Sequence, residues 1–325
     1  MRKIYYYTIL FFTLFLLTGC FFNGAESQRW PLAPEGATAF ALSADGRFAL
    51  YYSKKQQLSF WDLQQNRQLA ALGALDAEDT TVFHIEISDN NRFAITSSQQ
   101  NFAIWDLGLS QSTGLWSISD GVIRSLDISN NGTQVLLGLS NGKAIYVDLV
   151  TGRRLEFLAH QEKVNSVSLS ANGKYALSGG DDKFAYLWDT TSGQIINTFK
   201  HKHHVNQVAL QRDGKLAFTA DGSNQWRLWS IPSGKLYSEL TTFARGQVFS
   251  ISRFSHDGKQ ILTGTPAGLV MLWDAATGDK VKQWKTEPLK DSRPATAVVY
   301  DVAIDSQQRV ISATSAGIAQ AWLIE

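Results

Sequence analysis

The sequence contains a single cysteine, Cys20, among 325 residues. A disulfide within the chain is therefore excluded, and so is a cysteine nucleophile in the long segment that follows Cys20. A chain with no other thiol suits an oxidising compartment, where a free exposed thiol is reactive. An excess of charge of one sign is also missing, because 30 basic residues face 29 acidic ones. Nothing in this balance attracts a nucleic acid.

The chain begins with a positive start and a long apolar run. Met1-Arg2-Lys3 precede the uncharged segment from Ile4 to Leu17, which is the order found in secretory signals. The next residues, Leu17-Thr18-Gly19-Cys20, resemble the lipobox of bacterial lipoproteins. The resemblance implies a signal peptide over residues 1–19, cleavage before Cys20 and a lipid on this cysteine. An uncleaved anchor is the alternative, because residues 4–22 are close to the shortest helix that spans a bilayer.

Internal repeats dominate the rest of the chain. Each unit contains an anchor residue followed by a polar turn, as in FWDLQQNRQL, LWDTTSGQII and LWDAATGDKV. Successive anchors are 44, 42, 41, 41, 44 and 49 residues apart. The seven anchors are Trp61, Trp105, Val147, Trp188, Trp229, Trp273 and Trp322.

Turn signals repeat in phase with these anchors. Asn and Asp tolerate positive φ and Gly adopts it without steric cost, so Asx-Gly pairs favour tight β-turns. Two turn signals and one aromatic residue per period indicate four short strands in each unit. No sustained 3.6-residue apolar period follows the N-terminal segment, so helices are not expected there. The pairs are Asp45-Gly46, Asn131-Gly132, Asn172-Gly173, Asp213-Gly214 and Asp257-Gly258, with further glycines at Gly152, Gly193, Gly234 and Gly278.

Seven units of four strands predict a closed ring of blades, that is, an all-β fold forming a seven-bladed β-propeller. The pattern resembles the WD-repeat (Trp-Asp repeat) family over nearly all of residues 30–325. We therefore expect three regions in the chain. They are the signal peptide 1–19, a short tether 20–26 and the propeller 27–325.

The fourth unit is the most complete repeat, and the resemblance implies a buried hydrogen-bonded set within it. Four groups can form hydrogen bonds with one another inside a blade. They are a His in the entry loop, a hydroxyl on the second strand, an Asp in the next turn and an indole N–H. In the fifth unit His201 takes the histidine place, while Ser223 stands where the acid is expected. The expected set of the fourth unit is His160, Ser178, Asp182 and Trp188.

The two ends of the repeat region are expected to close the ring. The seventh unit stops after Trp322, one strand short, and the segment ESQRWPLAP at residues 26–34 precedes the first full unit. This segment is predicted to add the missing outermost strand, where Pro31 is tolerated because one side of such a strand is free. In the WD-repeat family this strand starts on the face that carries the first-to-second and third-to-fourth strand turns. That face is expected to lie toward the membrane.

Catalytic signatures are absent from the sequence, which has no GxSxG, HExxH or glycine-rich phosphate loop. We therefore expect no enzyme, no catalytic residues and no cofactor. The run Lys200-His201-Lys202-His203-His204 could bind a transition metal. A buried His201 beside a solvated His203 and His204 is the favoured interpretation, so no metal site is expected.

The resemblance to WD-repeat proteins implies a rigid disc that binds other proteins or peptides. With Cys20 lipidated, this role is placed in the bacterial cell envelope, with the propeller in the periplasm. The residue after Cys20 is Phe21 and not Asp. In this respect the chain resembles lipoproteins that are sent to the outer membrane. Without residues 1–19 the chain carries 28 basic and 29 acidic residues, so the expected partner is an envelope protein or peptide and no nucleic acid.

The expected partner-binding face is the one that points away from the lipid. The alternative function is an envelope enzyme or small-ligand binder that uses the central funnel. The long connection at residues 285–297 lies on the same expected face, either as a binding loop or as a tolerated insertion. The candidate residues of this face are Lys54, Lys202, His203, Arg245, Lys290 and Arg293.

Overall fold

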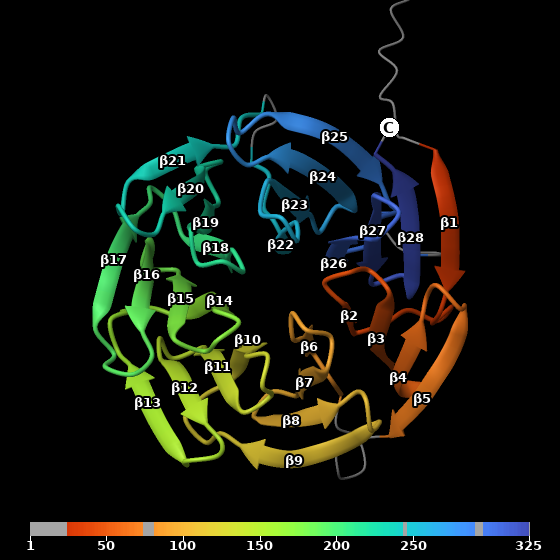
Figure 1. The fold of residues 1–325 in the computed structure, drawn as a ribbon, viewed down its shortest axis with the longest axis horizontal. Coiled ribbons are helices and arrows are strands. Elements are labelled where there is room, and N and C mark those ends of the chain that lie inside the picture. Colours follow the sequence, from red (N-terminus) through yellow and green to blue (C-terminus); the bar gives the residue numbers. More distant parts are fainter. Residues whose placement is uncertain (1–24, 74–80, 243–245, 290–294, 325) are drawn as a thin grey trace, which may run out of the picture.

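The computed structural model describes residues 25–73, 81–242, 246–289 and 295–324. In these ranges the regular structure consists of 28 strands in seven four-stranded antiparallel sheets. The sheets are arranged as blades around a central channel (Figure 1). The prediction of an all-β, seven-bladed propeller is therefore confirmed. The described residues contain no helix long and apolar enough to cross a membrane.

Each blade runs from an innermost strand at the channel to an outermost strand at the rim. Blades 1 to 3 consist of β2 (Ala39–Leu42), β3 (Phe48–Ser53), β4 (Gln57–Asp62) and β5 (Arg67–Gly73); β6 (His84–Ile87), β7 (Phe93–Ser97), β8 (Asn101–Asp106) and β9 (Gln111–Ser117); and β10 (Ile123–Ile128), β11 (Gln134–Leu139), β12 (Ala144–Asp148) and β13 (Arg153–Phe157).

Blades 4 to 6 follow the same order. They consist of β14 (Val164–Leu169), β15 (Tyr175–Gly180), β16 (Phe184–Asp189) and β17 (Ile195–Lys200); β18 (Val205–Leu210), β19 (Leu216–Asp221), β20 (Trp226–Ser230) and β21 (Leu236–Glu239); and β22 (Ile251–Phe254), β23 (Gln260–Gly264), β24 (Leu269–Asp274) and β25 (Lys280–Lys285).

Blade 7 combines the two ends of the described chain. Its sheet order is β1 (Glu26–Pro31), β28 (Ile318–Leu323), β27 (Arg309–Thr314) and β26 (Val299–Ile304). β1 pairs antiparallel with β28, with Glu26 opposite Trp322 and Pro31 opposite Ile318. The predicted closing strand is thus present, and it covers the edge of β28 as the outermost strand of the last blade.

A recurring serine shapes the turn between the first two strands. In blade 1 the Ser43 hydroxyl donates to Asp45 Oδ1 over 2.6 Å and accepts from the Phe48 N–H over 2.8 Å. Gly46 follows with a φ of 65°, which glycine adopts without strain. The same Ser–Asx hydroxyl bond recurs at Ser88, Ser129, Ser170 and Ser255. A local sequence rule therefore fixes this turn in five blades.

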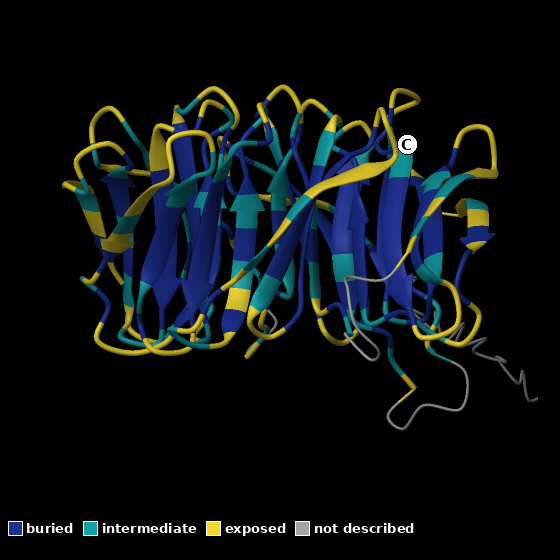
Figure 2. Cartoon of the chain, turned by 90° about the horizontal axis from the view of Figure 1, so that it is seen from below, coloured by how far each residue is buried: buried dark blue, intermediate teal, exposed yellow. Residues whose placement is uncertain are grey.

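The disc has two distinct faces. The turn face carries the turns between first and second strands and between third and fourth strands. The loop face carries the second-to-third turns and the connections between blades. Figure 2 shows buried strands through the middle of the disc and exposed residues at both faces. Because Glu26 lies opposite Trp322 at the end of β28, the closing strand β1 starts at the turn face.

Candidate functional site

The predicted hydrogen-bonded set of blade 4 is assembled as expected. His160 Nε2 lies 2.9 Å from Ser178 Oγ, and His160 Nδ1 lies 3.0 Å from both carboxylate oxygens of Asp182. The Trp188 indole N–H donates to Ser178 Oγ over 3.3 Å. Burial opposes ionisation of Asp182, but His160 and the N–H groups of Gln161 and Phe184 together outweigh it, so the pKa of Asp182 lies below its usual range. The carboxylate thus holds the Nδ1 proton, which leaves Nε2 to accept from Ser178.

This set shares the connectivity of a Ser-His-Asp triad, in which a histidine links a serine to an acid. A nucleophile must reach its substrate, however, and Ser178 is fully buried, as is the side chain of His160. Trp188 is also fully buried and stacks on Phe157 with ring centroids 4.6 Å apart. The four residues therefore hold blade 4 together rather than form an accessible reaction site.

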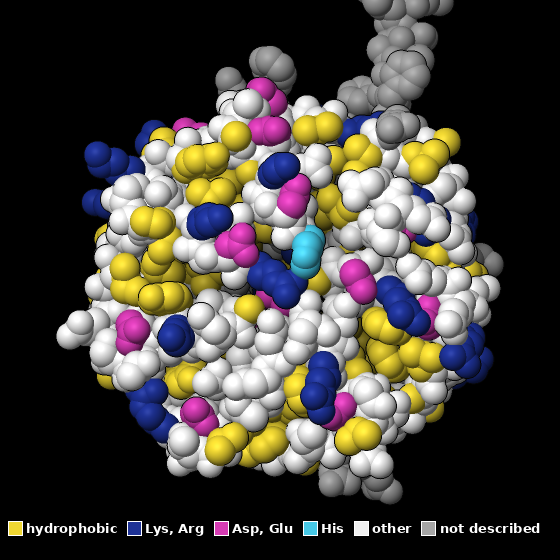
Figure 3. Space-filling view, in the orientation of Figure 1, with side chains coloured by type: hydrophobic (Ala, Val, Ile, Leu, Met, Phe, Trp, Pro, Cys, Tyr) yellow, Lys and Arg dark blue, Asp and Glu magenta, His cyan; other side chains and the backbone are white. Residues whose placement is uncertain are grey.

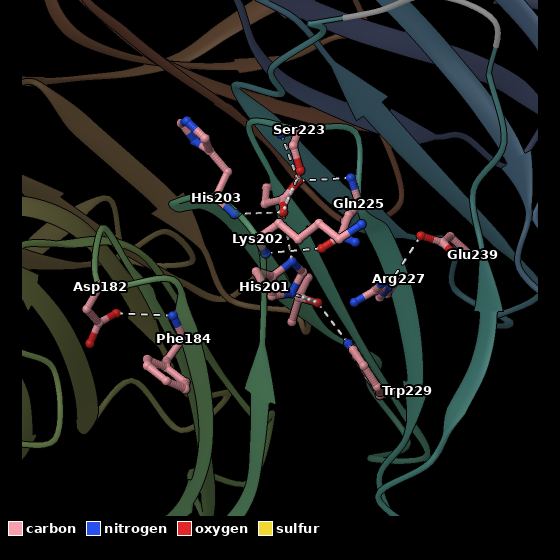
Figure 4. A network of polar contacts seen from close by, with 12 residues as sticks. Asp182, Phe184, His201, Lys202, His203, Ser223, Gln225, Arg227, Trp229 and Glu239 are labelled. Atoms are coloured by element: carbon pink, nitrogen blue, oxygen red, sulfur yellow. Dashed lines mark hydrogen bonds and ion pairs between the residues drawn. The ribbon is translucent and has the colours of Figure 1, made fainter.

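Blade 5 contains a second set, and here one sequence-based expectation is wrong. The acid is present, because Asp221 Oδ2 lies 3.4 Å from His201 Nδ1 (the hydroxyl of Ser223 instead donates to Asp221). His201 Nε2 and the Trp229 indole both contact Thr219 Oγ1 at 2.8 Å. Figure 4 shows His201, Ser223 and Trp229 close together, with dashed lines for the polar contacts of this set. The acid was missed because it follows the hydroxyl residue by two positions here, and by four in blade 4.

Asp221 also organises the start of the loop that carries the histidine run. Its carboxylate accepts from the N–H groups of Ser223, Gln225 and His203. Burial opposes ionisation, but the bond from His201 and these donors hold the pKa of Asp221 far below its usual range. This arrangement fixes the backbone of the loop at the face of the disc (Figure 4).

The candidate partner-binding residues are only partly described. Lys54 is exposed in the β3–β4 turn, and Lys202 and His203 are exposed in the connection from β17 to β18. All three lie on the loop face, but blade 1 and blade 5 lie on opposite sides of the ring (Figure 1). They therefore do not form one patch. Arg245, Lys290 and Arg293 lie outside the described residues, as does Cys20.

The rings of His203 and His204 contact each other, with centroids 4.1 Å apart. Within the described ranges, however, no group of three or more His, Cys, Asp or Glu residues is placed to hold a metal ion. The structure thus gives the histidine run no further ligand to complete a metal site.

The central channel contains charged side chains that sequence reasoning missed. It forms a cavity of about 430 Å³ lined by residues of the innermost strands, including Glu86, Asp127 and Arg253. Arg253, on β22, donates to Leu42 O of blade 1 and to Glu86 Oε1 of blade 2, both over 2.9 Å. Its guanidinium also lies 3.1 Å from Asp301 Oδ2 of blade 7. One side chain therefore connects four blades across the channel.

The acids of the channel also complete the innermost strands. These strands present unpaired N–H groups to the channel, and each such group needs an acceptor. Asp301 Oδ2 accepts from the Leu42 N–H over 2.7 Å, and Asp127 Oδ2 accepts from the Leu169 N–H over 2.6 Å. In both cases the acceptor belongs to the preceding blade. The carboxylates thus bind neighbouring blades together at their inner edges.

Burial changes the ionisation of these acids. It raises the pKa of Asp127 to about 7, although the N–H groups of Leu169 and Ile128 oppose the change. Burial also raises the pKa of Glu86 and of Asp301, against the attraction of Arg253. For Arg253 the nearby carboxylates outweigh burial and raise the pKa further, so this residue stays a cation.

The turn face mixes both signs of charge. Figure 3 shows lysine and arginine side chains interspersed with acids over this face, with basic side chains and a histidine near the centre. At the mouth of the channel on this side Arg212 Nη1 lies 3.2 Å from His256 Nδ1, between blades 5 and 6. No single-sign surface therefore covers the described part of this face.

Two family models match the chain. The model described as the Nucleolar protein 10-like, N-terminal domain, a β-propeller, matches residues 11–236. The model described as the WD domain, G-beta repeat, matches residues 235–274, which include β21 to β24. A search of curated proteins found no match. Together with the seven blades, these matches confirm the predicted WD-repeat propeller. Because the Nucleolar protein 10-like model covers more than half of the sequence, the chain belongs to the Nucleolar protein 10-like N-terminal domain family of β-propellers.

Proposed function

We propose that this protein is a lipid-anchored, non-enzymatic scaffold of the bacterial cell envelope, on which envelope proteins or peptides assemble. Propellers of this kind serve generally as scaffolds for protein interactions. The anchoring rests on Leu17-Thr18-Gly19-Cys20, behind the uncharged run of residues 4–17. The observation that carries the proposal is the place where the chain enters the disc, at Glu26 on the turn face.

This entry point gives the disc a direction relative to the lipid. Glu26 is six positions after Cys20, and an extended chain over six positions reaches about 20 Å. The turn face of blade 7 is therefore held close to the lipid in this proposal. The loop face, which carries Lys54, Lys202 and His203, points away from the membrane and is open to partners.

One observation favours the alternative of a small-ligand site in the central funnel. The channel cavity of about 430 Å³ falls in the size range of small-molecule sites, and it contains inward-facing acids. Asp127 bonds only main-chain N–H groups among the described residues. A screen of small cationic ligands by thermal shift tests this second candidate, with Asp127→Asn as the variant that should lose the response.

The first prediction concerns the anchor. In a bacterial host, Cys20→Ser should abolish lipid attachment and leave a precursor that keeps residues 1–19, because the thiol is the acceptor of the lipid. Metabolic labelling with a radioactive fatty acid and mass spectrometry of the N-terminus measure both effects. Label on the serine variant, or a wild-type N-terminus other than Cys20, would contradict the anchor. Density fractionation of wild-type envelopes tests the outer-membrane destination in the same preparation.

The second prediction concerns the working face. Charge reversal at Lys54 and Lys202 together should weaken partner capture from cross-linked envelopes by about threefold to tenfold, because charges at the rim of an interface change association rates. The matched control is Lys174→Glu, an exposed lysine on the turn face of blade 4, which should leave capture unchanged. Capture lost only in the Lys174 variant would show that the opposite face binds the partner.

A further inference from the structure

The two most exposed large hydrophobic side chains of the described residues lie at the tips of neighbouring turns. Val150 is 76 % exposed in the turn between β12 and β13, and Leu109 is 66 % exposed in the turn between β8 and β9. Both turns connect a third strand to a fourth strand, so both tips lie on the turn face. They belong to blades 3 and 2, which are adjacent in the ring (Figure 1). The turn face therefore presents apolar tips from two neighbouring blades.

The fold does not require apolar residues at these tips. In blade 3 Asp148 Oδ1 accepts from the Val150 N–H over 3.0 Å, which closes the turn through the main chain. In blade 1 the corresponding carboxylate accepts from the Gln65 N–H, and the two tip positions hold the exposed side chains of Gln64 and Gln65. The same turn thus forms with polar tips. An apolar residue that is exposed without a structural gain points to a contact outside the fold.

The outermost strands also expose apolar side chains next to the turn face. In β17 Ile195 at the turn-face end is exposed, whereas Phe199 near the loop-face end is buried. β25 repeats this arrangement with an exposed Val281 and a buried Trp284. Near the start of β21 the exposed Tyr237 adds an aromatic ring with a polar end, which suits a boundary between apolar and wet surroundings. Figure 3 shows hydrophobic side chains between the charged ones over this face. On the loop face the exposed large hydrophobic residues of the described ranges are fewer, namely Phe83, Val122, Leu158 and Val248.

The chain enters the disc on the same face, but on the other side of the ring. β1 begins at Glu26 on the turn face, six positions after Cys20. Blade 3, which carries Val150, lies across the ring from β1 (Figure 1). A tether of about 20 Å at one rim holds only that rim near the lipid. An apolar contact at blades 2 and 3 adds a second support across the disc, so that the turn face lies flat on the membrane.

We propose that the turn face docks on the surface of the phospholipid bilayer that holds the anchor, with Leu109 and Val150 inserted at the boundary between headgroups and acyl chains. The contact depends on the lipid anchor of the proposed function and adds a second attachment, through the folded disc itself. Because the face carries both signs of charge, the apolar side chains rather than the charged ones supply the attraction. The loop face with Lys54 and Lys202 then stays open to partners.

The test measures which face of the lipidated, full-length protein contacts the bilayer. Thr191→Cys places one thiol in the β16–β17 turn on the turn face, and Glu162→Cys places one in the connection before β14 on the loop face. Each thiol carries a fluorophore, and the protein is reconstituted in phosphatidylcholine vesicles that contain nitroxide-labelled lipid. A nitroxide at about 5–10 Å into the boundary, the depth that interfacial apolar groups reach, should quench the Thr191→Cys probe. The Glu162→Cys probe should stay unquenched. Quenching of both probes, of neither, or of the Glu162→Cys probe alone would overturn the proposal.

Glutamine at the two tips shows whether the apolar side chains hold the disc. Leu109→Gln combined with Val150→Gln gives both turns the kind of side chain that blade 1 already has, so the unfolding midpoint should not change. Quenching of the Thr191→Cys probe should fall by about half or more, because interfacial binding scales with the apolar area buried. The matched control is Leu158→Gln, which removes an apolar side chain that is 62 % exposed on the loop face, and quenching should not change. Undiminished quenching with both glutamines in place would contradict insertion of the tips.

The same preparation separates the apolar contact from charge and from the anchor. Because the turn face carries both signs of charge, quenching should be equal with and without phosphatidylglycerol and at low and high salt. Quenching that requires anionic lipid and disappears at high salt would show that basic side chains hold the disc instead of the apolar tips. Wild-type protein that takes up the thiol probe would have a free Cys20, which contradicts the anchor itself. An unlabelled wild type together with an unquenched Thr191→Cys probe would contradict the docking alone.

Discussion

Deletion of residues 26–31 should abolish the cooperative unfolding of the whole propeller and leave an aggregating chain. These residues form β1, the only strand that blade 7 takes from the other end of the described chain. Without it, β28 becomes an edge of six residues with free N–H and C=O groups. Such an edge pairs with other chains. Urea unfolding followed by circular dichroism, with sedimentation to measure aggregation, checks the result.

A single side chain should account for much of this effect. Trp30 is 1 % exposed, and its indole N–H donates to Leu63 O over 3.0 Å, which connects blade 7 to blade 1. Truncation of a buried aromatic side chain costs about 3–5 kcal/mol, so Trp30→Ala should lower the free energy of unfolding by about that amount. The control on the same strand is Arg29→Ala, whose ion pairs are exposed and contribute little. An unchanged midpoint for Trp30→Ala would mean that β1 does not hold the ring closed.

The blade count could be predicted because it depends on local signals, and the closure was predicted by counting the strands at the two ends of the repeat region. An anchor, two turns and a short apolar run recur in each unit, and each signal acts within about ten residues. The buried set of blade 4 was predictable for the same reason, since Ser178 and Trp188 lie ten residues apart on adjacent strands. Asp221 shows the limit of this reasoning. The hydroxyl and the anchor Trp are ten residues apart in both blades, but in blade 5 the acid stands two positions earlier in the segment between them, and the pattern hid it.

The channel could not be predicted, because it depends on residues that only the closed ring brings together. Arg253 and Glu86 are 167 residues apart in the sequence, and no repeat pattern gives them a common feature. The same holds for Asp301 and the Leu42 N–H from which it accepts, which are 259 residues apart.

Arg253→Met should be the most destabilising single substitution in the channel. Its guanidinium bonds Glu86 and Leu42 O and lies 3.1 Å from Asp301, while its side chain is only 16 % exposed. Removal of one partner of a buried ion pair costs about 3–5 kcal/mol, because the remaining charges stay buried without compensation. The partly open channel admits water to Glu86, whose side chain is 27 % exposed. The lower end of this range is therefore expected in urea unfolding.

The stability lost through Arg253→Met should increase with pH, because the acids of the channel have raised pKa values. A carboxyl whose pKa is higher in the folded state keeps its proton while the unfolded chain has released it, so the free energy of unfolding falls as pH rises through that window. For Asp127 the window extends from 3.8 to about 7. The Arg253 cation opposes the rise in the pKa of Glu86 and of Asp301. Without Arg253 both pKa values rise further, so the free energy of unfolding falls more with increasing pH. The Arg253→Met protein should therefore lose more stability at about pH 8 than at about pH 5.

Two further variants decide whether the carboxylates carry this effect. Arg253→Met combined with Glu86→Gln should recover part of the stability at about pH 8, because the double variant no longer buries an unpaired charge at Glu86. Arg212→Met at the mouth of the channel is the control, since this residue is exposed and its contact is with His256. An equal loss for Arg253→Met at both pH values would show that Arg253 acts through packing and its bond to Leu42 O, with the channel acids uncharged throughout.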